Sequence, residues 1–149
     1  MPTPAHALTS EEIALIRSTF AAAAKQPDAT AALFYAKLFT LDPSLRGLFH
    51  GDMRAMGEKF ISMLAMVAAN LSHLDRLLPT VRQLGERHAG YRVQDAHYVT
   101  VGAALLAALA ENLGPAWSPA AHTAWSKAYD LLSSTMIEAA HQAAQKKAS

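Results

Sequence analysis

Apolar residues recur at spacings of three and four along most of the chain, which is the spacing of residues on one face of an α-helix. The clearest case is residues 56–71, where this spacing predicts an amphipathic helix of about 17 residues. No long segment shows the alternation of apolar and polar residues that is typical of a half-buried strand. The pattern therefore predicts an all-α fold with six main helices and one short helical insert.

Residues that favour helix ends mark the boundaries of these elements. Thr9 and Glu12 have the spacing of a capping box at the start of the first helix. Asp42 can cap the short insert with Pro43 in its first turn, and Gly114 can end the helix before the last one. The first helix is broken at residues 25–30, the insert covers residues 42–49, and the other main helices cover about 31–41, 56–71, 77–90, 95–112 and 118–139.

The composition is that of one folded domain. Hydrophobic residues make up 52% and charged residues 17% of the 149 positions. A chain of this length buries about 68–70% of the surface that its unfolded form exposes, so one sizeable core is expected. We expect a single domain over residues 1–149, with residues 1–7 and 142–149 as flexible tails.

Charge and cysteine content exclude several classes of function. The net charge is +1, with 13 basic and 12 acidic residues spread along the chain, which predicts no nucleic-acid or membrane partner. The absence of cysteine excludes disulfides, thiolate catalysis and cysteine-ligated metals. The most apolar stretch, residues 98–114, is interrupted by Glu111 and predicts a buried helix rather than a membrane span. The amino-terminal residues do not have the pattern of a secretory signal, so a cytoplasmic location is expected.

Two histidines raise the question of a metal site. His88 shares an apolar stripe with Val81 and Leu84 and is predicted to point inward. A buried imidazole needs a partner, which is either a backbone carbonyl in the core or a metal. His97 lies beside Asp95 at the start of the next helix, where a capping role is favoured over a ligand role.

Three segments in the same order resemble one protein family: "LDPSLRGLF", "LGERHAGYRVQDAHYVTVG" and "AWSKAYDLL". They are similar to the bacterial single-domain haemoglobins, which are related to the globin domain of flavohaemoglobins and to neuroglobin-like bacterial globins. The resemblance runs from about Leu8 to Met136. It implies a globin fold around a haem b pocket, and the haem would be held without a covalent bond because the chain has no C-x-x-C-H motif.

The resemblance assigns the proximal ligand of the haem and further residues of its pocket. His88 matches the ligand of the haem iron, which makes it the expected metal ligand. Phe49, six residues after Pro43, matches the phenylalanine that packs on the porphyrin. Leu84 and Val93 are expected to line the same pocket. A neutral imidazole in an apolar slot is also what the chemistry of a ferrous haem requires.

On the distal side, Tyr35 matches a tyrosine whose phenol faces the bound gas. The alternative is a core tyrosine bonded to a backbone carbonyl, and Phe34 is expected to be core. Met56 stands where the family commonly has glutamine or histidine, and Phe60 stands in place of the usual leucine or valine. Met56 could instead bind iron as a sixth ligand. Lys59 is expected to reach a haem propionate.

A second departure from the family lies beside the proximal histidine. Tyr98 matches a tyrosine that in flavohaemoglobin-like globins joins this histidine and a glutamate of the last helix by hydrogen bonds. The glutamate position is Ala140 here, and Glu138 is about 200° away around the helix. A carboxylate at this place pushes electron density onto iron, so its loss favours ligand binding over oxygen activation.

The resemblance implies reversible binding of oxygen, and also of nitric oxide and carbon monoxide, in transport, scavenging or sensing. One alternative is a nitric oxide dioxygenase. Because the chain ends at Ser149 without a flavin domain, turnover would then depend on a separate reductase. Another alternative is a haem-free interaction module in which His88 is a core residue. Both a monomer and a homodimer remain open.

Overall fold

The computed structural model describes residues 8–49, 51–90 and 94–148. In these residues six α-helices are joined by short connections, and no strand is present. The helices are α1 (Ser10–Ala23), α2 (Pro27–Leu41), α3 (Met53–Ala69), α4 (Leu74–Gly90), α5 (Asp95–Leu113) and α6 (Pro119–Ala148), with 3-10 segments η1 (Pro43–Leu48), η2 (Leu71–His73) and η3 (Gly114–Ala116). The predicted all-α fold is confirmed, and η1 is the predicted insert.

The expected capping residues begin their helices. The Thr9 hydroxyl accepts a hydrogen bond from the Glu12 amide, and the Glu12 carboxylate accepts one from the Thr9 amide, which confirms the capping box. The Asp42 carboxylate accepts from the amide of Ser44 at the start of η1. The second helix begins earlier than predicted because Pro27 stands in its first turn, where a missing amide proton is tolerated.

The last helix is longer than predicted. α6 continues to Ala148, so residues 142–148, which were expected as a tail, prolong the helix. The other residues expected in tails, 1–7 and 149, lie outside the described residues.

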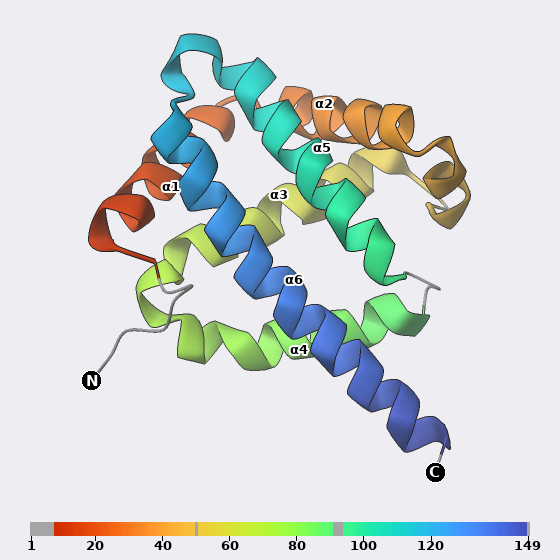
Figure 1. Ribbon diagram of the computed structural model, residues 1–149. Helices are drawn as coiled ribbons and strands as arrows, with labels where there is room; N and C mark the ends of the chain where they lie inside the picture. The colour runs from red at the N-terminus through yellow and green to blue at the C-terminus, as the bar shows by residue number, and fades with distance from the viewer. Residues whose placement is uncertain (1–7, 50, 91–93, 149) are drawn as a thin grey trace.

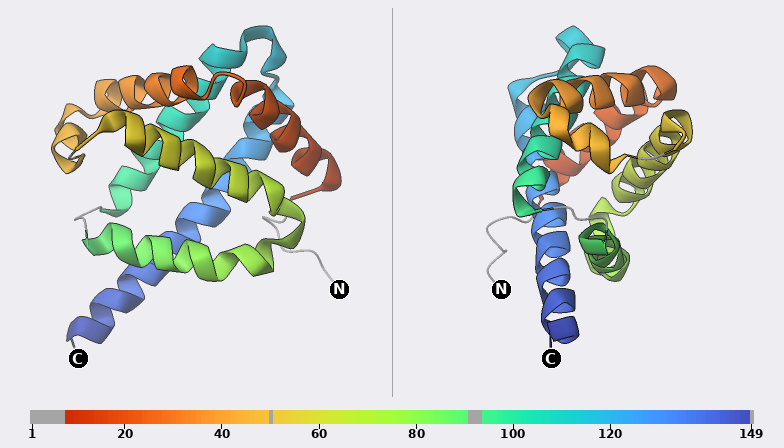
Figure 2. Two further views of the ribbon diagram at one scale, coloured as in Figure 1. Left: turned by 180° about the vertical axis from the view of Figure 1, so that it is seen from behind. Right: turned by 90° about the vertical axis from the view of Figure 1, so that its right-hand side faces the viewer.

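Each long helix packs on a helix that is distant in sequence. α6 crosses the molecule and packs on α4, while α2 lies against α5 and α3 (Figure 1). Figure 2 shows α3 running to η2 and α4 turning back from it. α3 and α4 therefore follow one another in the chain but are held mainly by different partners, α2 and α6. The most deeply buried large apolar side chains of the core are Ile16, Leu38 and Leu109.

α5 is the most apolar long helix. The segment Asp95–Ala116 is long and apolar enough to cross a membrane by length and composition, and 28% of the apolar 18-residue stretch within it is buried. Its side chains Leu105 and Leu109 are among the core residues, and α5 packs on α2. In this fold α5 serves as a helix of the core.

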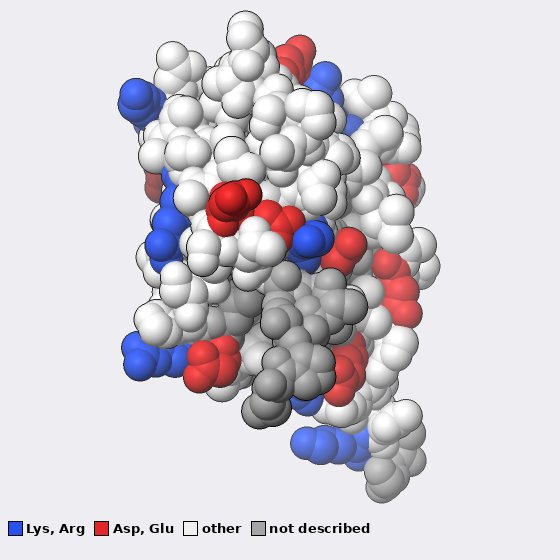
Figure 3. All heavy atoms as spheres, turned by 60° about the vertical axis from the view of Figure 1, so that its left-hand side comes forward, with Lys and Arg blue, Asp and Glu red and all other residues white. Residues whose placement is uncertain are grey.

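Charges are mixed on the face that Figure 3 shows. Acidic and basic side chains alternate over its middle and lower parts, and the upper part carries few of either. This face therefore shows no concentrated patch of positive or of negative charge.

Candidate functional site

The imidazole of His88 is half-buried near the end of α4. Its Nδ1 lies 2.7 Å from the carbonyl oxygen of Leu84, one helical turn earlier. A carbonyl can only accept, so Nδ1–H donates this bond, and in the neutral ring the lone pair then lies on Nε2. Burial lowers the pKa of His88, while the bond to Leu84 acts in the opposite direction. The ring is therefore held in the neutral form that can bind a metal.

α4 approaches α6 very closely at Gly85, three residues before His88. A Cβ atom at position 85 would lie 2.6 Å from the Cα of Met136 and closer still to its carbonyl oxygen. Both distances are shorter than side chains tolerate, and the obstacle is backbone, so only glycine permits this contact. On the same side, Arg82 lies 4.0 Å from the carboxylate of Glu138. α6 thus fixes the backbone that carries His88.

Aromatic rings from α2, α3 and the end of η1 form a second part of the site. The ring of Tyr35 lies 5.1 Å from that of Phe34, 5.5 Å from Phe49 and 6.5 Å from Phe60, measured between ring centroids. Phe34 stacks on Phe60 at 4.2 Å. Phe39 lies 6.1 Å from Tyr35 and 5.5 Å from Phe49. Three residues expected in the haem pocket, Tyr35, Phe49 and Phe60, are therefore brought together.

Tyr35 supplies the polar group of this aromatic cluster. Burial raises the pKa of Tyr35, so its phenol keeps its proton and can donate a hydrogen bond. Within the described residues, the hydroxyl has no hydrogen bond, so the alternative of a bond to a backbone carbonyl is not observed. Phe34 is only 3% exposed, as expected of a core residue.

Four of the five other expected pocket residues, including Tyr98, lie within the described residues. Met56 is half-buried and Lys59 is exposed, both on α3. Leu84 is half-buried on α4, one turn before His88. Val93 lies outside the described residues.

Tyr98 is buried on α5 with its ring centroid 6.4 Å from that of His88. Its hydroxyl is buried and has no hydrogen-bond partner in the described part of the chain. Glu138, the carboxylate nearest in sequence to Ala140, instead faces Arg82 on α4. With alanine at position 140, no acceptor among the described residues reaches this phenol, which is an unfavourable state for a buried polar group.

Replacing Tyr98 with phenylalanine should raise the free energy of unfolding by about 1 kcal/mol, because it removes a buried polar atom that has no partner among the described residues. The matched control is Tyr129→Phe, since the Tyr129 hydroxyl donates to the carbonyl of Tyr98 and its loss should lower stability by about the same amount. Urea denaturation of both variants measures the difference. Equal destabilisation by the two substitutions would show that the Tyr98 hydroxyl has a partner in solution.

His97 has the capping role expected from the sequence. Its Nδ1 accepts a hydrogen bond from the backbone amide of Gln94, at the start of α5. Among the described residues, no three histidine, aspartate or glutamate side chains come together to hold a metal ion. A metal bound through His88 would therefore need most of its ligands from another molecule, as in a porphyrin.

Comparisons with known proteins decide the family. A model of the globin family matches residues 32–136, which include Tyr35, Phe49 and His88. The chain is a globin. Globins normally bind haem, and the neutral His88 together with the aromatic cluster fits that group.

The curated relatives are larger proteins. This globin is 32% identical over 133 residues to a flavohemoprotein of Bordetella parapertussis, across 87% of its own chain and 33% of the relative. It is 28% identical over 134 residues to a flavohemoprotein of Vibrio cholerae, across 88% and 34% of the two chains. The chain thus spans about a third of the length of these relatives.

Solved structures confirm the fold. An engineered carbene transferase derived from a putative nitric oxide dioxygenase of Rhodothermus marinus is 29% identical, with a TM-score of 0.85 over 95% of this chain and 99% of that one. A bacterial globin of Campylobacter jejuni is 26% identical, with a TM-score of 0.77 over 90% and 97%. A flavohemoglobin of Malassezia yamatoensis with bound FAD and heme, 24% identical, has a TM-score of 0.73 over 91% and 37%.

Two features of the site were not identified from the sequence. Phe39 extends the aromatic cluster, and its signal was its spacing of one helical turn from Tyr35 on the same helix. Gly85 allows the contact of α4 with α6, and its only signal was a glycine inside a predicted helix, which often marks a close packing contact.

Proposed function

We propose that this globin binds haem b through His88 and that its function is reversible binding of oxygen, with nitric oxide and carbon monoxide as further ligands. The observation that carries the proposal is the bond from Nδ1 of His88 to the Leu84 carbonyl, which leaves the metal-binding lone pair on Nε2. The membership of the globin family and the haem bound to the Malassezia flavohemoglobin support the same cofactor.

The residues of the chain then have separate roles. A ferrous haem supplies an iron atom at which diatomic gases bind reversibly. His88 would hold the iron, and Phe49 and Phe60 would exclude water from the side where the gas binds. Tyr35 would donate a hydrogen bond to the bound gas, since its phenol is protonated and has no bond to the described residues. Lys59, which is exposed, is suited to a haem propionate.

Met56 is the one described residue of α3 that was expected to compete for the iron. Its thioether is a known haem ligand, and the side chain is half-buried. In that arrangement a gas would have to displace sulfur before binding, which would slow association at every gas concentration.

Replacing Tyr35 with phenylalanine should speed dissociation of oxygen by about tenfold to a hundredfold, because a hydrogen bond to a partly charged acceptor contributes about 1.5–3 kcal/mol. Stopped-flow mixing of the oxygenated protein with an oxygen scavenger measures this rate. Carbon monoxide is the matched control ligand, since it carries little negative charge and its dissociation should change much less. An unchanged oxygen rate would show that Tyr35 does not contact the gas.

A second candidate function is a nitric oxide dioxygenase that depends on a separate reductase. It is favoured by the likeness to the engineered protein from a putative nitric oxide dioxygenase of Rhodothermus marinus. The unsatisfied hydroxyl of Tyr98 argues against it, because no carboxylate of the described residues joins Tyr98 to increase the electron donation of His88. Steady aerobic consumption of nitric oxide with an added reductase distinguishes this enzyme from a gas-binding protein.

A further inference from the structure

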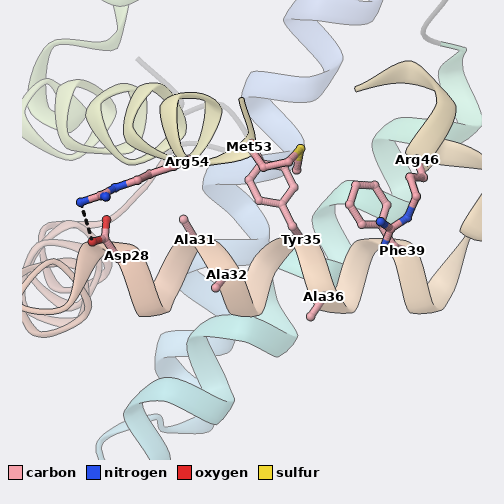
Figure 4. A pocket seen from close by; sticks show the side chains of 10 residues that line it. Asp28, Ala31, Ala32, Tyr35, Ala36, Phe39, Arg46, Met53 and Arg54 are labelled. Atoms are coloured by element: carbon pink, nitrogen blue, oxygen red, sulfur yellow. Dashed lines mark ion pairs between the residues drawn. The ribbon is translucent and has the colours of Figure 1, made fainter. Parts of the chain in front are cut away.

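A groove open to solvent lies between α2, η1 and the start of α3, and it has a volume of about 610 Å³. Figure 4 shows the side chains that line it, with Tyr35 rising from α2 toward Met53 of α3. The middle of the groove is apolar, formed by Ala32, Ala36 and the ring of Tyr35. About 10–15 Å³ of such space is enough to hold one water molecule, so the groove can admit a small gas.

Charged side chains are confined to the ends of this groove. At one end Arg54 lies 3.9 Å from the carboxylate of Asp28 (Figure 4). Arg54 also lies 4.0 Å from the carboxylate of Glu58. At the other end the guanidinium of Arg46 lies 4.8 Å above the ring of Phe39. Because Arg54 faces carboxylates and Arg46 is stacked on an aromatic ring, the groove favours a small uncharged solute over an anion.

Tyr35 belongs both to the groove and to the aromatic cluster of the site. Its ring lines the groove and also contacts Phe49 and Phe60, at 5.5 Å and 6.5 Å between centroids. Tyr35 is therefore shared by the open groove and by the residues proposed to line the gas-binding pocket.

Gly57 lies beside that ring where α2 and α3 cross. A Cβ at position 57 would lie 2.9 Å from the Cβ of Ala31, so the glycine lets α2 and α3 cross closely. The same Cβ would lie 3.9 Å from Cε2 of Tyr35, which is an ordinary van der Waals distance. The Tyr35 hydroxyl has no hydrogen bond to the described residues that would hold the ring in one position.

We propose that this groove is the route by which an apolar diatomic gas reaches the proposed haem pocket, with the ring of Tyr35 as the gate. The inference rests on the proposed function, since it requires a gas-binding haem. Movement of one side chain between staggered positions is fast enough to admit a gas without moving a helix.

Filling the groove with Ala36→Trp tests the route, because Ala36 is exposed on α2 and lines the groove. Flash photolysis of the carbon monoxide complex should show association slowed by at least about fivefold, with dissociation slowed by the same factor, since a blocked path changes both rates and leaves the affinity unchanged. Ala65→Trp is the matched control, because Ala65 is exposed on α3 and does not line the groove, and its rates should equal those of the parent.

Xenon provides a readout that does not depend on gas binding at iron. In protein with ¹³C-labelled alanine methyl groups, the NMR signals of Ala32 and Ala36 should shift under xenon pressure, and that of Ala65 should stay unchanged.

Unchanged rates in Ala36→Trp, or the absence of the xenon shifts, would overturn the proposed route. If Met56→Trp alone slows association, the gas passes by Met56 instead. If the protein binds no haem at all, the proposed function is wrong, and the proposed gas route is then wrong as well.

Discussion

Replacing His88 with glycine is expected to abolish stable haem incorporation. His88 is the residue proposed to hold the iron, so without its imidazole the iron would lose that ligand. We expect the fraction of chains that retain haem to fall by at least tenfold, which corresponds to about 1.4 kcal/mol. Absorbance of the haem relative to protein after gel filtration measures this fraction.

Two controls separate ligand loss from unfolding of the chain. Millimolar imidazole should restore haem binding to His88→Gly, because the free ring can enter the space that the side chain leaves. His97→Ala should keep its haem and lose only about 0.5–2 kcal/mol of stability, since His97 caps α5. The assignment would be wrong if His97→Ala, and not His88→Gly, released the haem.

Gly85→Ala should have the second largest effect on haem retention. It changes the position of His88 and not the chemistry of its imidazole. The added Cβ would lie 2.6 Å from the Cα of Met136, so α4 must move away from α6. Overpacking of this kind costs about 1–3 kcal/mol, which exceeds the gain of up to about 1 kcal/mol from the better helix propensity of alanine. The free energy of unfolding should fall, and transfer of haem to an excess of an acceptor globin should become faster.

The matched control is Gly47→Ala, because a Cβ at position 47 would meet no atom within 4 Å. That variant should transfer haem at the rate of the parent protein. If Gly85→Ala also behaved as the parent, the contact between α4 and α6 would not determine where His88 lies.

Much of the site could be predicted because it depends on helical periodicity. The stripe that contains Leu84 predicted an inward His88, and the family resemblance added Tyr35, Phe49 and Phe60. These residues can be recognised in the sequence, since each is a large side chain at a fixed spacing from its neighbours. The structure brings the three aromatic residues into one cluster.

The rest depends on distances between helices, which no single segment encodes. Gly85 matters because of the backbone of Met136, about fifty residues later in the chain, and the groove lies beside the place where α2 and α3 cross at Gly57. The unsatisfied hydroxyl of Tyr98 could be predicted only in part from the sequence. The family resemblance predicted a glutamate at position 140, where the sequence has alanine, but the structure was needed to show that no other group of the described residues bonds to Tyr98.

The measurement that tests haem binding through His88 most directly is the absorption spectrum of the purified protein, first ferric, then reduced with dithionite, and finally exposed to carbon monoxide. We predict a Soret band that becomes five-coordinate on reduction and shifts sharply with carbon monoxide. A six-coordinate ferrous spectrum would instead indicate that Met56 or another side chain occupies the position of the gas. The absence of a Soret band even after addition of haem would contradict haem binding and favour a haem-free interaction module.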